Sequence, residues 1–356
     1  MLHHYAPMTD TMKAVLVREH GGTDKLLIEN APKPVIRPDE VLISVKASGI
    51  NHLDIWVRKG VPGHKFPLPM ILGTDVAGVV AEKGALVDNV NIGDRVAVMP
   101  GFAKPTSEEA LSGKIHLARD YGIFGETRNG GCAEFMDAPA VNLMPMPEWM
   151  SFTDAAACPL VFLTAYTMLR KADLQPGEIV LMHAAGSGVT SAGIQIAKLL
   201  GATVITTAGS DDKLAKAKAL GADFGINYRT QDFVEETKKI AGRAGVDVIF
   251  DHVGPDTFEG NMKAIKWGGR IVTCGSTTGG EVKLNLRAVF FKRVSIIGST
   301  MGPKADQLTV WKLLTQKKLK PVVDRVFPVA QVGQAHEYVE SRKGFGKVVL
   351  DLASWG

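Results

Sequence analysis

Two rhythms of apolar residues divide the chain near residue 150. Before that point, short runs of alternating apolar and polar residues, such as 12–17 and 41–47, are separated by Gly and Pro. This pattern is typical of β-strands joined by turns. After residue 152, short apolar runs alternate with longer segments of helical periodicity, the signature of a parallel sheet with crossover helices. We therefore expect a β-rich domain followed by an α/β domain with a doubly wound parallel sheet, and a loose extension over residues 1–11.

The second part of the chain predicts most of its elements directly. After residue 302 we expect a further helix and a strand over 347–352 that return to the first domain. The predicted domains are therefore 1–151 together with 302–356, and 152–301. The expected strands are Ile179–His183, Thr203–Thr207, Val246–Asp251, Gly269–Cys274 and Val294–Ile297, and the expected helices are Ser191–Leu200, Asp212–Leu220 and Phe233–Ala241.

Composition narrows the class of protein. A chain of 356 residues exceeds what one core usually supports, and 46% hydrophobic with 22% charged residues fits neither a disordered chain nor a membrane protein. The net charge is only +4, and the basic residues are interleaved with acidic ones. This distribution argues against nucleic acid as a partner. Three cysteines without metal-type spacing suit a reducing compartment, and no secretory signal is visible. We expect a cytoplasmic protein that binds small molecules and no membrane.

A glycine-rich turn follows the first strand of the α/β part. The segment 184–190 reads Ala-Ala-Gly-Ser-Gly-Val-Thr and leads into a helix. Small residues there let backbone N–H groups and the helix dipole reach a pyrophosphate. Alone, so degenerate a motif could be an ordinary strand-to-helix turn, but its place in an alternating series favours a Rossmann dinucleotide site. The candidate cofactor contacts in this turn are Gly186, Ser187, Gly188, Val189 and Thr190.

The end of the next strand selects the cofactor. NAD-preferring sites place Asp or Glu there to bind the ribose 2′-OH, whereas this strand ends in Ala-Gly-Ser. Ser210 and Lys213 could bind a 2′-phosphate, and Tyr228, after the third strand, is placed to pack on the adenine end. The two aspartates after Ser210 are interpreted as the first turn of the next helix, where the dipole favours acids. These residues predict NADPH as the cofactor.

Seven short motifs are spread over nearly the whole chain from Met12 onward. They lie at 49–54, 72–78, 93–96, 131–135, 163–166, 186–190 and 344–349. Together they resemble the medium-chain dehydrogenase/reductase superfamily, in its zinc-free, quinone oxidoreductase-like branch. The resemblance implies a β-rich GroES-like catalytic domain beside the Rossmann domain.

The resemblance also addresses zinc. Zinc-bearing members bind the catalytic ion through Cys, His and Cys and relay a proton through Ser or Thr, but the matching positions here are Asn51, Thr74, Leu160 and, for the relay, Leu53. None of these side chains is a zinc ligand of the usual kind. His52 is interpreted as lining the cofactor side of the cleft, and Cys158 as helix packing. The four cysteines that hold a structural zinc are matched by Lys104, Ser107, Ala110 and Ala118.

Without a Lewis acid, hydride addition from NADPH to a quinone or an α,β-unsaturated carbonyl is easier than alcohol oxidation. The resemblance places Asn51 and Thr164 near the nicotinamide and its ribose. The indole of Trp56 can form an apolar wall of the site and donate one hydrogen bond. The candidate catalytic residues are therefore Asn51, Trp56 and Thr164. Solvent is a plausible proton source. Further candidate cofactor contacts are Gly275, Ser276 and Ser299, toward the carboxamide and ribose, and Lys347, near the phosphates.

Two other functions stay open at this point. One is a zinc-type alcohol dehydrogenase with rearranged ligands, and the other is a non-catalytic NADPH-binding protein. The segment 292–298 is predicted to be the last strand of the Rossmann sheet, with an edge that invites pairing. We therefore expect a homodimer or homotetramer, the alternative being a monomer in which a loop covers that edge.

Overall fold

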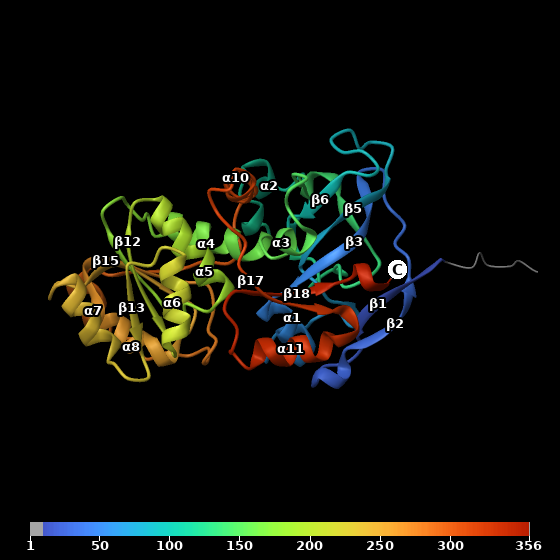
Figure 1. The fold of residues 1–356 in the computed structure, drawn as a ribbon. Helices are drawn as coiled ribbons and strands as arrows, with labels where there is room; N and C mark the ends of the chain where they lie inside the picture. Colours follow the sequence, from blue (N-terminus) through green and yellow to red (C-terminus); the bar gives the residue numbers. More distant parts are fainter. Residues whose placement is uncertain (1–9, 356) are drawn as a thin grey trace, which may run out of the picture. The chain divides into compact units, whose positions relative to one another are not determined.

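The computed structural model describes residues 10–355, so most of the expected N-terminal extension lies outside the described residues. The chain forms two compact units, whose elements are drawn in Figure 1. Unit 1 comprises Met1–Leu160, Val323–Lys343 and Lys347–Gly356, and unit 2 comprises Val161–Val322 and Gly344–Gly346. Each unit has its own sheet system and its own core.

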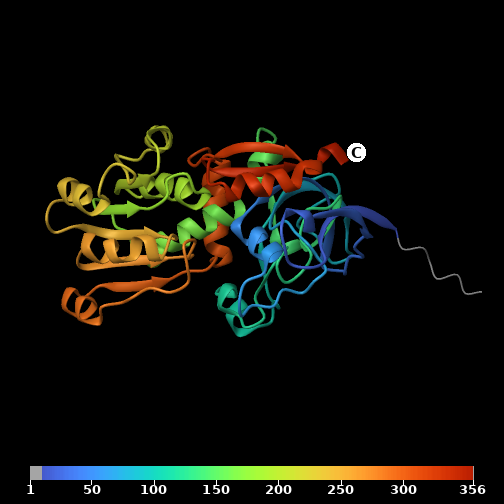
Figure 2. The ribbon, with the colours of Figure 1, turned by 90° about the horizontal axis from the view of Figure 1, so that it is seen from below.

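Unit 2 is built on a six-stranded parallel sheet in the order β13-β12-β11-β14-β15-β16. The first strand therefore lies in the middle, and the chain switches direction between β11 and β14, as in Rossmann folds. Helices cover both faces of the sheet (Figure 2). The strands are β11 Ile179–Met182, β12 Thr203–Ala208, β13 Phe224–Asn227, β14 Val246–Asp251, β15 Ile265–Thr273 and β16 Ser295–Gly298.

The helices of unit 2 confirm the expected alternation and add to it. They are α4 Pro159–Lys171, which begins in unit 1, α5 Gly188–Leu199, α6 Asp211–Ala219, α7 Phe233–Ala241, α8 Pro255–Ala264, α9 Leu286–Lys292 and α10 Lys304–Thr315. The helix α8 was not expected, although Pro255 at its first position is a recognised start signal. No helix within residues 10–355 is long and apolar enough to cross a membrane.

The segment 302–322 packs with unit 2, whereas the sequence placed it with the first domain. Asp306 of α10 accepts hydrogen bonds from Thr167 Oγ1 at 2.8 Å and Arg170 Nε at 3.0 Å, both on α4. Further on, the side chain of Gln195 makes two hydrogen bonds with the backbone of Lys320. These polar contacts hold the segment, which local sequence patterns could not show.

Unit 1 is rich in β-structure, as predicted. Its largest sheet runs β10-β6-β5-β3-β18-β17 with β9 also paired to β3, beside sheets β2-β1-β4 and β7-β8. Its strands are β1 Thr11–Val17, β2 Leu27–Pro32, β3 Glu40–Ile50, β4 Met70–Ile71, β5 Asp75–Lys83, β6 Arg95–Val98, β7 Gly101–Phe102, β8 Gly122–Ile123, β9 Phe135–Pro139, β10 Leu143–Pro145, β17 Val323–Pro328 and β18 Lys347–Asp351. Its helices are α1 His52–Lys59, α2 Glu108–Leu111, α3 Phe152–Ala156 and α11 Val332–Glu340.

Strand register in unit 1 brings distant residues together. Strand β3 pairs with β5 so that Gly49 lies opposite Asp75, and with β18 so that Ile50 lies opposite Val348. The residues that end β3, begin β5 and begin β18 are therefore neighbours. This junction contains the polar network described below.

Strand β16 lies at the edge of the Rossmann sheet. Within residues 10–355 it pairs only with β15. Ile296 on this strand is 39% exposed, and Phe290 and Phe291 on the preceding helix α9 are 62% and 61% exposed. An edge of this kind, beside exposed aromatic rings, favours pairing with a second copy of the chain. The homodimer remains a prediction.

We expect light scattering at micromolar concentration to give two or four chain masses. Ile296→Lys should shift the protein toward one chain mass, because a charge on an edge strand opposes strand pairing. The control is Ile28→Lys, at a 42% exposed position on β2 of unit 1, which should leave the mass unchanged. A wild-type protein of one chain mass would contradict the dimer.

Candidate functional site

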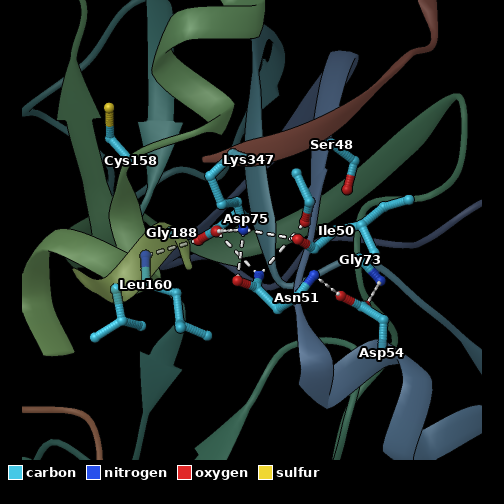
Figure 3. A network of polar contacts seen from close by, with 12 residues as sticks. Ser48, Ile50, Asn51, Asp54, Gly73, Asp75, Cys158, Leu160, Gly188 and Lys347 are labelled. Carbon is cyan, nitrogen blue, oxygen red and sulfur yellow. Dashed lines mark hydrogen bonds and ion pairs between the residues drawn. The ribbon is translucent and has the colours of Figure 1, made fainter. Parts of the chain in front are cut away.

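A buried ammonium group lies where β3, β5 and β18 of unit 1 meet (Figure 3). Lys347, the first residue of β18, is only 4% exposed. Its Nζ donates to Ile50 O at 2.8 Å, Asn51 Oδ1 at 2.5 Å and Asp75 Oδ2 at 3.0 Å. An ammonium group has three protons, so all of its donors are used within the protein.

The partners of Lys347 are themselves fully engaged. Asn51 Nδ2 donates to Asp75 Oδ2 at 3.0 Å and to Gly49 O at 3.4 Å, while its Oδ1 accepts from Lys347. The other carboxylate oxygen of Asp75 accepts from the backbone N–H of Leu160 at 2.8 Å. We call Asn51, Asp75, Lys347 and the N–H of Leu160 the Lys347 network. It ties three strands to the first turn of helix α4.

A second carboxylate fixes Asn51 from its backbone side. Asn51 precedes helix α1, and the buried Asp54 accepts from Asn51 N at 2.7 Å and from Gly73 N at 3.0 Å. Burial raises the pKa of Asp54 to about 6, against the effect of these two hydrogen bonds. Gly73 has φ +102°, and a Cβ there would lie 2.6 Å from Cys132 N, so only glycine fits. Both faces of Asn51 are thus held.

The residues beside the network differ in exposure. His52, the first residue of α1, is exposed, and desolvation by surrounding protein atoms together with the charges of Arg342 and Lys347 lowers the pKa of its imidazole. Trp56 on the same helix is 40% exposed and is free to present its indole as a wall. Thr164 on α4 is buried, with 5% exposure. The catalytic roles of Trp56 and Thr164 stay predictions.

The glycine-rich turn of unit 2 has the form that a pyrophosphate requires. Ser187 precedes helix α5, and its hydroxyl accepts from Val189 N at 3.2 Å. A Cβ on Gly186 would lie 2.9 Å from Gly344 O and 3.3 Å from Lys213 Nζ, so glycine keeps this space open beside the lysine. Thr190 donates its hydroxyl proton to His183 O at 2.7 Å, which anchors the start of the helix to β11. The residues therefore fit a dinucleotide phosphate.

Several polar side chains gather beyond the end of β12. Ser210 precedes helix α6, and its hydroxyl accepts from Lys213 N. Tyr228 Oη and Arg229 Nε lie 2.7 Å and 3.2 Å from the point that a Cβ on Gly209 would occupy. Arg229 was not among the predicted contacts, although a basic residue directly after Tyr228 was a visible signal. Asp211 accepts from Asn227 Nδ2 at 2.8 Å, as part of the first turn of α6.

The loops after β15 and β16 lie side by side. Ser299 N donates to Thr273 O at 2.8 Å, and Thr273 Oγ1 donates to Gly275 O at 3.0 Å, next to Ser276. Within the described residues, Ser299 Oγ is buried and has no hydrogen-bond partner. A buried hydroxyl without a partner costs free energy unless a ligand satisfies it. This orphaned atom therefore fits a polar group of a bound cofactor.

Comparison with known proteins covers both units. Residues 37–148 match the family model described as alcohol dehydrogenase GroES-like domain, and residues 188–316 match that of zinc-binding dehydrogenase. The quinone oxidoreductase of Sus scrofa is 30% identical over 96% of this chain and 98% of its own length. The chain belongs to the medium-chain dehydrogenase/reductase superfamily. The resemblance seen in the sequence is thereby confirmed.

Other members differ in their named activities. A crotonyl-CoA carboxylase/reductase of Cereibacter sphaeroides is 30% identical over 91% of this chain and 83% of its own length. A crystal structure titled as an NAD-dependent alcohol dehydrogenase is 45% identical, with a TM-score of 0.93, over 96% of this chain and all of that one. The family is therefore established, whereas the acceptor must be argued from the site.

The residues at the superfamily's catalytic zinc position do not fit zinc. Asn51, Thr74 and Leu160 offer no thiolate, imidazole or carboxylate, and the nearby Asp75 is already paired with a cation. Cys158 donates its Sγ–H to Asp154 O, and burial raises the pKa of its thiol, which keeps it protonated. Its sulfur points away from the network in Figure 3. Within residues 10–355 no group of three His, Cys, Asp or Glu could hold a metal ion.

The segment that matches the structural zinc site also has no cysteine at its four matched positions. Ser107 caps the short helix α2, its hydroxyl accepting from Ala110 N at 3.1 Å, and Lys104 N donates to Asp120 Oδ2 at 3.1 Å. Ala118 is buried at the far end of the segment. Helix capping and backbone hydrogen bonds therefore occur at positions where zinc-bearing members have cysteine ligands.

The role implied for Lys347, contact with the cofactor phosphates, stays a prediction. The resemblance implied that it lies near the cofactor phosphates, but its three donors are taken by Ile50, Asn51 and Asp75. It has no proton left for a phosphate oxygen. In the same way, both amide hydrogens of Asn51 are occupied, which leaves none for a substrate oxygen.

We expect protein purified without added zinc to contain far less than one zinc per chain by plasma emission spectroscopy. Treatment with a chelator should leave turnover unchanged, because no donor set of the zinc type is present among residues 10–355. Stoichiometric zinc together with loss of activity on chelation would overturn this interpretation of the site.

Proposed function

We propose that this protein is an NADPH-dependent oxidoreductase that transfers hydride to a quinone or an α,β-unsaturated carbonyl compound without a metal. NADPH, when bound, supplies the hydride. The observation that carries the proposal is the Lys347 network, in which Asn51, at one of the matched zinc positions, is hydrogen-bonded to Asp75 and Lys347 and offers no zinc-type ligand. Oxidation of a simple alcohol is harder at a site without a Lewis acid and a proton relay, and the relay position holds Leu53. An electron-poor double bond needs neither.

The named relatives support this choice in part. Quinone oxidoreductases of several mammals and crotonyl-CoA carboxylase/reductases are among the proteins to which the chain is similar. Alcohol dehydrogenases are also among them, so a zinc-type enzyme with rearranged ligands is the alternative in the same family. The donor set argues against that alternative. A non-catalytic NADPH-binding role is the alternative of another class.

The preference for NADPH rests on the residues beyond β12. No carboxylate ends that strand, and Lys213 and Arg229 bring two positive charges toward Gly186 and Gly209. A 2′-phosphate binds well to such cations, whereas the 2′-OH of NADH gains nothing from them. Ser210 adds a hydroxyl at the start of α6. The buried hydroxyl of Ser299 would serve the nicotinamide end.

The rest of the reaction needs orientation and exclusion of water. Trp56 would form a wall of the acceptor site and offer its indole N–H to an oxygen that gains negative charge. The further apolar walls are Phe66, Leu68 and Phe102, which pack partly buried against the core of unit 1. Thr164 would contact the nicotinamide or its ribose. Solvent is the proposed source of the proton.

We expect fluorescence titration to show NADPH binding at least about tenfold more tightly than NADH, or about 1.4 kcal/mol. Lys213→Glu should narrow or reverse this ratio, because it replaces an attractive charge by a repulsive one. The matched control is Lys216→Glu, three residues along the same helix and paired with Asp212, which should leave the ratio unchanged. Equal dissociation constants for the wild-type protein would refute the cofactor assignment.

Stopped-flow oxidation of NADPH against a panel of quinones, enones and aldehydes tests the reaction itself. We expect turnover with quinones or enones, and none with simple alcohols and NADP⁺. Turnover confined to alcohols and aldehydes would favour the alcohol dehydrogenase alternative. Tight NADPH binding without turnover of any acceptor would favour the non-catalytic one.

A further inference from the structure

The buried ion pair between Lys347 and Asp75 is linked to helix α4. The side chains of Lys347 and Asp75 are 5% and 0% exposed, so neither charge is screened by water. A buried ion pair of this kind is stable only while each charge keeps its partner, and removal of one partner leaves the other uncompensated. The pair is therefore a strong local constraint.

The carboxylate of Asp75 transmits this constraint to a helix. Its Oδ1 accepts from Leu160 N, the second residue of α4, where an anion is also favoured by the helix dipole. Lys347 holds the other oxygen of the same carboxylate. The orientation of the carboxylate, and with it the first turn of α4, depends on the ammonium group.

Thr164 lies one turn further along the same helix. Residues four apart on an α-helix share a face, so Leu160 and Thr164 lie on the same side of α4. A catalytic group displaced by about 1 Å can lose roughly two orders of magnitude in rate. The geometry of the hydrogen bond from Leu160 N to Asp75 therefore affects where Thr164 lies.

We propose that Lys347 is a built-in structural cation at the matched zinc position, and that it positions the first turn of α4, and thereby Thr164, for hydride transfer. Asn51 is a positioning residue in the same network, since its side-chain amide bonds to Asp75 and Lys347 and to the backbone of Gly49. The catalytic part of this inference rests on the proposed function. The structural part does not.

A double-mutant cycle tests the charge coupling. Lys347→Met leaves Asp75 buried and unpaired, and we expect it to lower Tm by about 6 °C or more. Asp75→Asn combined with Lys347→Met should recover at least half of that loss, because the amide oxygen can still accept from Leu160 N and no charge remains. The control is Lys239→Met, which breaks the surface ion pair with Glu236 and should shift Tm by less than about 2 °C.

Single-turnover kinetics with deuterated NADPH tests positioning. In Lys347→Met we expect the hydride-transfer step to slow at least about tenfold, with an expressed isotope effect. The dissociation constant of NADPH should change less than about threefold, because Lys347 spends no proton on a phosphate. The double variant should regain much of the rate. A purely structural role would lower Tm without slowing the step in the folded protein.

Each contrary result points to a different error. A double variant no more stable than Lys347→Met would overturn the charge coupling, and an unchanged hydride-transfer rate would overturn the positioning role. If Lys347→Met weakens NADPH binding tenfold or more, Lys347 is a phosphate ligand and the inference fails. If Lys347→Met does not fold, the double variant must fold and transfer hydride within about tenfold of wild type, or the inference fails. A wild-type protein that turns over no acceptor would defeat the proposed function alone, since the Tm cycle needs no turnover.

Discussion

An ammonium group removed from water must find an acceptor for each of its protons, and this requirement organises the core of unit 1. Lys347 meets it with one backbone carbonyl, one amide and one carboxylate, supplied by the end of β3 and the start of β5. The carboxylate in turn accepts from the first turn of α4. The strand register, the start of α1 and the start of α4 are therefore linked through one buried charge.

Unit 2 depends on a different arrangement of charge. There the N-termini of helices α5 and α6 and nearby cationic side chains lie just beyond strands β11 and β12, and helix N-termini favour a phosphate group. Ser187 and Ser210 each cap a helix, and Lys213 and Arg229 lie beside the glycines at those caps. Ser299 adds a buried hydroxyl without a hydrogen-bond partner among the described residues, although unit 1 also has such atoms, for example Thr74 Oγ1. The glycine-rich turn, the helix caps and the nearby cations are the features that fit the proposed binding of the cofactor by unit 2.

Many bounds of helices and strands could be predicted, because they depend on residues close together in the sequence. Strands β11, β12, β14 and β16 and helices α5 to α7 lie within a few residues of their expected bounds, since apolar periodicity and caps act over one element. No bounds were predicted for helices α4, α8 and α9 or for strand β13, and β15 begins at Ile265, four residues before the expected start. The replaced zinc ligands could be found by matching motifs, because a ligand position is identified by its neighbours in sequence. The alternation of strands and helices likewise sufficed for the fold class.

The sequence by itself thus determined the fold class, the glycine-rich turn between β11 and α5, and the lack of zinc-type side chains at Asn51, Thr74 and Leu160. Only the tertiary structure decided what occupies that position instead. Lys347 is 296 residues from Asn51 and 272 from Asp75, and their contact depends on the register of β3 with β5 and β18. The proximity of Arg229 to Gly209 and the packing of 302–322 on α4 and α5 were hidden for the same reason. Side-chain partners far apart in sequence are set by how elements pack, and no local pattern encodes that packing.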